Sequence, residues 1–109
     1  MIRTFIETPI FTKKWYELGL SDEDLQRLQN SLLSNPKLGC VIPGTNGLRK
    51  VRITCKNSGK RGGARVLYVD VEVKDTIHLI NVYAKNEKDD LTIAERNAIA
   101  SVLSLLKEE

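Results

Sequence analysis

Basic side chains are concentrated in one short stretch of the sequence, between Arg49 and Arg65. This stretch holds seven of the 17 Lys and Arg residues and no acid, so the remaining ten basic and 14 acidic residues carry a net charge of −4. Segregated charge decides which partners a protein attracts more strongly than the total of +3 does. The stretch predicts a site that binds an anionic ligand.

Two of these cations share one face of a predicted strand. Apolar and polar residues alternate over residues 48–55, which is typical of a strand covered on one face only. Lys50 and Arg52 then lie on the uncovered face, about 6.5 Å apart at Cα. An antiparallel neighbouring strand would bring Arg65, Lys60 or Arg61 to the same end. The alternative interpretation is a solvated strand face that keeps the hairpin soluble.

The loop over residues 56–63 is rich in glycine but is not a phosphate-binding P-loop. It lacks the required order of glycine, lysine and serine or threonine, and no helix follows it. Its glycines instead provide backbone freedom, which would let Lys60 and Arg61 reach a flexible partner.

Other chemistry is sparse. The single histidine, His78, lies in mid-strand among apolar residues, which favours a structural role. We expect no metal site and no cofactor, because the chain offers no plausible His/Cys/Asp set and no carboxylate pair in the basic region. A polar group follows the last predicted strand and could flank the cations, or could simply form a charged turn: Tyr83, Lys85, Asn86 and Lys88.

The order of the elements is predicted to be β-α-α-β-β-β-α. Thr8-Pro9, Ser21 and Thr92 are typical helix starts, the last followed by Glu95 as in a capping box. We expect strands over residues 2–7, 48–55, 64–73 and 76–83, and helices over 9–19, 22–34 and 93–106. Residues 35–47 have no regular periodicity and are predicted to be a connection.

The predicted fold class is α+β, as one domain over residues 1–109. A largely antiparallel sheet would be packed by an αα-hairpin and a C-terminal helix. With 41% hydrophobic and 28% charged residues, the composition is that of an ordinary globular protein. No run of eighteen apolar residues occurs and the N-terminus lacks a signal-peptide pattern, so we expect a cytoplasmic location and no membrane partner.

Three segments resemble a known family in their order and spacing. They are NPKLGCVIPGTNGLRKVRI, GKRGGARVLYV and VYAKNEKDDLT. Together they closely resemble the HigB branch of the RelE toxin superfamily, and the likeness covers nearly the whole chain. It departs from the usual pattern at Cys40, where an acid is frequent, and at Asn46, where glycine is frequent.

The resemblance implies a RelE-like toxin that enters the ribosomal A site and cleaves the mRNA there. In this family a ribose 2′-oxygen attacks the adjacent phosphorus, leaving a 2′,3′-cyclic phosphate and a 5′-hydroxyl, and no metal is needed. The implied partners are the 70S ribosome, mRNA and a cognate antitoxin with a helix-turn-helix domain. Promoter DNA would be contacted only through the antitoxin.

The implied site residues follow from matching positions. Lys50 and Arg52 match the basic pair of the RelE active strand, and Arg65 matches the arginine that opens the next strand. Asn86 stands where many members have another arginine, and Thr92 stands near their functional tyrosine. The leaving-group acid is therefore open, with Tyr83 and Lys85 as substitutes. The predicted RNA-binding residues are Arg49, Lys60, Arg61 and Lys88.

The same cations suit this chemistry physically. Neighbouring positive charge disfavours the charged form of an amine, so Lys50 could take the 2′-proton. Arg52 and Arg65 would stabilise the phosphorane. Two alternatives remain: a ParE-like protein that inhibits DNA gyrase by binding, and a non-catalytic RNA-binding module. The basic set favours the nuclease, because a gyrase inhibitor does not need it.

Overall fold

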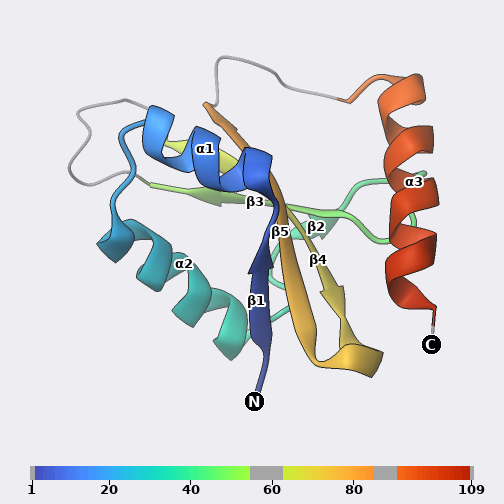
Figure 1. The fold of residues 1–109 in the computed structure, drawn as a ribbon, viewed down its shortest axis with the longest axis horizontal. Coiled ribbons are helices and arrows are strands. Elements are labelled where there is room, and N and C mark those ends of the chain that lie inside the picture. The colour runs from blue at the N-terminus through green and yellow to red at the C-terminus, as the bar shows by residue number, and fades with distance from the viewer. Residues whose placement is uncertain (1, 55–62, 85–90, 109) are drawn as a thin grey trace.

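The fold is a five-stranded sheet with helices on both of its faces (Figure 1). A computed structural model describes residues 2–54, 63–84 and 91–108. The elements are β1 (Thr4–Glu7), α1 (Pro9–Glu17), α2 (Asp22–Ser34), β2 (Cys40–Val41), β3 (Arg49–Ile53), β4 (Ala64–Val71), a 3-10 turn (Glu72–Lys74), β5 (Thr76–Ala84) and α3 (Ile93–Lys107).

The sheet is largely antiparallel, as predicted. Its strand order is β1-β5-β4-β3-β2, and among the strands of the described residues only the β1–β5 pair is parallel. The α+β class and the order of the predicted elements are confirmed. No helix among the described residues is long and apolar enough to cross a membrane.

Two local predictions were wrong. Residues 35–47 are not all connection, since Cys40 and Val41 form the short edge strand β2. A two-residue strand is too short to show periodicity in a sequence. The strand predicted over 64–73 ends at Val71, where a 3-10 turn begins that closes on Asp75 with a positive φ of 51°.

The predicted helix starts are present as capped N-termini. The side chains of Thr8, Ser21 and Thr92 each accept a backbone N–H in the first turn of α1, α2 and α3, respectively. The last two form complete capping boxes, which satisfy two otherwise unpaired backbone groups each.

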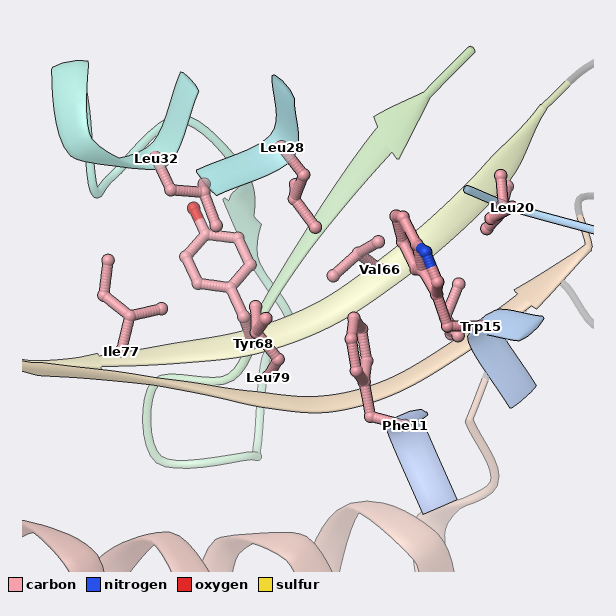
Figure 2. Packing of buried hydrophobic residues seen from close by; sticks show 11 residues of the cluster. Phe11, Trp15, Leu20, Leu28, Leu32, Val66, Tyr68, Ile77 and Leu79 are labelled. Carbon is pink, nitrogen blue, oxygen red and sulfur yellow. The ribbon is translucent and has the colours of Figure 1, made fainter. Parts of the chain in front are cut away.

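The larger hydrophobic cluster lies between the sheet and the first two helices (Figure 2). The rings of Phe11 and Trp15 stack with centroids 5.4 Å apart, and both side chains are fully buried. The Trp15 indole N–H donates to the Ser21 carbonyl at 3.0 Å, so its polar atom is satisfied in the core. Val51 and Ile53 of β3 pack against this cluster, as their alternation predicted.

A second cluster lies on the other face, beneath α3. It includes Leu67 and Val69 of β4, Tyr83 of β5 and Leu103 of α3. Leu103 is the one buried residue among the described residues of α3. In Figure 1 α3 lies at the right of the sheet, whereas β3 ends at the left.

Candidate functional site

The strand register brings the predicted basic residues onto one face of the sheet. Arg52 of β3 pairs directly with Arg65 of β4, and Arg65 pairs with Tyr83 of β5. Lys50 lies two residues before Arg52 on β3 and pairs with Leu67 of β4. Since side chains two apart on a strand share a face, Lys50, Arg52 and Arg65 lie on the α3 side of the sheet. We call these three residues the cationic row.

The Arg52–Arg65 pair is of the close kind. The Leu48 carbonyl accepts from the Ile42 N–H on the β2 side, at 2.8 Å, whereas the Ile53 carbonyl faces Gly63 on the β4 side. Carbonyl direction alternates along a strand, so the backbone groups of Arg52 point away from β4. A pair of this kind is not hydrogen-bonded, and its Cα atoms lie about 4.5 Å apart.

Two like charges in such a pair repel each other. Directly opposed cross-strand pairs typically change stability by roughly 0.2–1 kcal/mol, and like charges are unfavourable. No acidic side chain forms an ion pair with the cationic row within the described part of the chain. An anion bound between the two guanidinium groups would remove this repulsion.

Arg65 has an unused donor in a protected place. Its Nε atom is buried and has no hydrogen-bond partner. A buried N–H without a partner costs about 1–3 kcal/mol. On β3, Arg52 is exposed and Lys50 is half-buried. On β4, the buried Nε atom of Arg65 is protected from solvent.

Gly63 sets how closely β4 approaches β3 at this end. Its φ is +67°, and a Cβ atom there would overlap the carbonyl oxygen of Ile53. Only glycine adopts this conformation without a steric penalty. Gly63 thereby allows Arg65, two residues later, to lie opposite Arg52.

Tyr83 extends the row across β5 but is largely covered. It is 4% exposed and belongs to the cluster beneath α3. The structure therefore places Tyr83 beside Arg65, with its ring packed among apolar side chains.

Arg49 lies on the opposite face from the cationic row. It is one residue from Lys50, and it pairs with Tyr68, whose ring lies in the cluster beneath the first two helices. Its guanidinium donates to the carbonyls of Gly39 at 2.6 Å and Lys37 at 3.3 Å. The structure thus gives Arg49 a role in holding the segment before β2, and it does not bring Arg49 to the row.

Five predicted site residues fall outside the described residues: Lys60, Arg61, Lys85, Asn86 and Lys88. Thr92 is described as the N-cap of α3, where its hydroxyl accepts from the Glu95 N–H at 3.1 Å. Among the residues that the structure describes, no group of three His, Cys, Asp or Glu side chains could hold a metal ion.

His78 is a half-buried residue of β5, paired with Ile6 on one side and Val69 on the other. Burial, with a smaller contribution from the positive charge of Lys74, lowers the pKa of His78 below its ordinary value. The ring therefore favours the neutral form, which suits a position between apolar strand neighbours.

A groove of about 280 Å³ runs between α2 and β3. Its lining includes Arg27 and Ser31 of α2, Leu38, and β3 residues 51–53. Arg27 forms an ion pair with the buried carboxylate of Asp24, so the helix side of the groove is internally paired. Arg52 is one of the lining residues, so the groove reaches the cationic row at β3.

Comparison with known proteins establishes the fold. No family model matches the sequence. The structure is similar to that of the E. coli toxin RelE, solved as a mutant in the free state, with a TM-score of 0.59 and 16% identity; the match covers 94% of this chain and 98% of that one. It is also similar to a chain of the intact E. coli RelBE toxin–antitoxin complex, with a TM-score of 0.56 and 18% identity, over 73% of this chain and 93% of that one. The chain has the RelE fold, as predicted.

Two residues near the row were not found by sequence reasoning. Asn81 of β5 pairs with Leu67 of β4. The Thr8 hydroxyl donates a hydrogen bond to the carbonyl of the neighbouring Ile80, at 2.7 Å. The sequence does hold a signal here, because the consecutive apolar residues Leu79 and Ile80 break the alternation of the strand.

Proposed function

We propose that this chain is the toxin of a type II toxin–antitoxin system, of the HigB branch of the RelE superfamily, and that it cleaves mRNA in the ribosomal A site. The observation that carries the proposal is the close Arg52–Arg65 pair with Lys50 on the same face. A sheet face with three neighbouring cations, and no acid paired to them in the described chain, suits a reacting phosphate. The RelE fold and the sequence motifs support the same assignment.

The proposed reaction divides its work among the row. The ribose 2′-oxygen attacks the adjacent phosphorus while Lys50 takes the 2′-proton on Nζ. Arg52 and Arg65 donate to the non-bridging oxygens of the phosphorane, whose extra negative charge they stabilise. The bond from phosphorus to the 5′-oxygen then breaks, which leaves a 2′,3′-cyclic phosphate and a 5′-hydroxyl.

The 5′-oxygen must also receive a proton. Lys85 and Tyr83 are the candidate donors, and Asn86 can hydrogen-bond to the phosphate. The 4% exposure of Tyr83 favours Lys85, because a covered phenol reaches a bulky substrate poorly. The proposal uses no metal ion.

The proposed partners are the 70S ribosome, mRNA and a cognate antitoxin with a helix-turn-helix domain, through which promoter DNA would be bound. The RelBE complex that this fold resembles contains a toxin and its antitoxin, which supports a partner of that kind. The exposed positive charge of Arg52 suits an acidic or extended antitoxin segment.

The test is expression of the chain alone, followed by primer extension on a translated message. We expect growth arrest, with cuts inside codons that occupy the A site. Arrest with intact mRNA and altered DNA supercoiling would instead favour a ParE-like gyrase inhibitor. Arrest of translation without mRNA cleavage would favour a non-catalytic RNA-binding module.

A further inference from the structure

Strand β5 contains a bulge next to the candidate site. Leu67 of β4 pairs with Asn81, but the following residue, Tyr68, pairs with Leu79. Ile80 is therefore one extra residue on β5. A bulge of this kind reverses the alternation of side chains beyond it.

The reversal is visible in the two hydrophobic clusters. Ile77, Leu79 and Val82 belong to the cluster beneath the first two helices, whereas Ile80 and Tyr83 belong to the cluster beneath α3. Regular alternation from Ile77 and Leu79 would have placed Tyr83 with the first cluster. The bulge therefore decides that Tyr83 lies on the same face as Arg65, its direct partner.

Thr8 makes three hydrogen bonds at this point. Its N–H donates to the Leu79 carbonyl at 3.1 Å, and its hydroxyl donates to the Ile80 carbonyl at 2.7 Å. The same hydroxyl oxygen accepts from the Phe11 N–H at 3.1 Å, as the N-cap of α1. A hydroxyl can donate and accept at once, so one side chain joins the helix start to the bulge.

Strand β1 ends at Glu7, so the outer edge of β5 has no strand partner beyond Leu79. The structure fills that edge with side chains. The Thr8 hydroxyl donates to the Ile80 carbonyl, and the Asn81 side-chain oxygen accepts from the Val82 N–H at 2.8 Å. Between them, these contacts hold the extra residue in place.

We propose that Thr8 is a positioning residue for the cationic row, which acts through the Ile80 bulge to keep the end of β5 in the register that puts Tyr83 beside Arg65. This inference rests on the proposed function where activity is measured. The competing explanation is that Thr8 is only a helix cap, whose loss lowers stability and nothing else.

Replacement by aspartate separates the two roles. Thr8→Asp keeps an oxygen that can cap α1 but loses the donor to Ile80, and it places a carboxylate against a carbonyl. Thr8→Ser keeps both roles. Ser21→Ala removes the cap of α2, whose hydroxyl hydrogen-bonds to Asp24, and is the matched control for loss of a cap.

The first measurement is amide hydrogen exchange, which does not depend on activity. Arg65 and Tyr83 form a hydrogen-bonded pair, because the backbone groups of Arg65 point away from β3 and toward β5. We expect Thr8→Asp to speed exchange at both amides about tenfold or more relative to the same amides in Ser21→Ala. Equal protection in the two variants would overturn the proposal.

The second measurement is single-turnover mRNA cleavage on programmed ribosomes. Because a misplacement of about 1 Å can cost about 100-fold, we expect Thr8→Asp to lower the maximal rate tenfold to 100-fold with little change in half-saturation. Thr8→Ser should cleave like the wild type. If Thr8→Asp cleaves at the same rate as Ser21→Ala, the proposal is wrong and Thr8 acts only as a helix cap.

If Thr8→Asp does not fold, Thr8→Ala is compared with Ser21→Ala, since each loses one cap and only the first loses the contact to Ile80. If the wild type itself does not cleave, the proposed function fails. The exchange comparison then still decides whether Thr8 holds the bulge.

Discussion

Arg52 and Arg65 stand directly opposite each other on β3 and β4, as a close pair of like charges. Cross-strand neighbours in a stable sheet are usually apolar or oppositely charged. This pair therefore lowers the stability of the sheet. It also concentrates positive charge at one place on its surface. Several measurable consequences depend on it.

Removing one charge of the pair should separate stability from activity. We expect Arg52→Gln to leave the free energy of unfolding unchanged or to raise it by up to about 1 kcal/mol, because repulsion is relieved. The same change should lower the cleavage rate about 100- to 1000-fold, the usual effect of losing one transition-state donor. Denaturant unfolding and cleavage on programmed ribosomes measure the two quantities.

The control for this substitution is Lys13→Gln, which removes an exposed charge on α1. It should leave both quantities nearly unchanged. Equal loss of activity in the two variants would mean that the cationic row contributes only to the overall charge of the protein.

A bound anion should stabilise the folded protein through the same pair. We expect sulfate to raise the melting temperature more than sodium chloride at equal ionic strength, because a ligand that binds only the folded state stabilises it. Arg52→Gln should lose most of this difference. An equal response of the two proteins to sulfate would show that the anion binds elsewhere or acts as a general solute.

Cleavage should depend strongly on the ribosome. The described site contains cations but no paired acid and base carboxylates, so much of the barrier reduction must come from a substrate held in position. Positioning can contribute roughly 7–11 kcal/mol. We expect very slow cleavage of naked RNA and fast cleavage of the same sequence in programmed ribosomes, and comparable rates on the two substrates would refute this dependence.

The stability of the protein should fall as the pH drops below about 6.5, the ordinary pKa of histidine. Because burial and Lys74 lower the pKa of His78, the unfolded state binds a proton more readily than the folded state does. The stabilising contribution is present above the unfolded pKa and is lost as the pH falls through the folded pKa. Melting curves between pH 8 and about 5 should show a smaller decline for His78→Gln than for the wild type. Parallel curves would assign the decline to other groups.

Gly63→Ala should destabilise the fold by more than 1 kcal/mol. The positive φ of 67° and the carbonyl oxygen of Ile53 both oppose a Cβ atom at this position. Gly44→Ala is a useful comparison, because Gly44 also has a positive φ, of 78°, but no heavy atom lies within 4 Å of a Cβ built there. Denaturant unfolding should show the larger loss for Gly63, and equal losses would mean that the contact with Ile53 is unimportant.

Much of this arrangement could be predicted from the sequence, because its signals are local. The alternation around Lys50 and Arg52 indicated their shared face, and an antiparallel neighbour was enough to bring Arg65 opposite. The capping residues indicated where each helix begins. Periodicity and caps depend on a few adjacent residues, and so they are visible in one sequence.

The features that were missed depend on contacts between distant segments. Strand β2 exists because Cys40 pairs with Lys50, and the Arg49 guanidinium donates to the carbonyls of Lys37 and Gly39. The bulge at Ile80 is contacted by the hydroxyl of Thr8, which is 72 residues away in the sequence. Such contacts leave little trace in the order of residues.

The separation of the two hydrophobic clusters has a consequence for substitutions in the cationic row. The stacked rings of Phe11 and Trp15 lie on one side of the sheet, and the cationic row lies on the other. We therefore expect substitutions at the exposed Arg52 to leave the packing of these rings unchanged. The similarity to RelE at 16% identity shows that this fold is compatible with very different sequences.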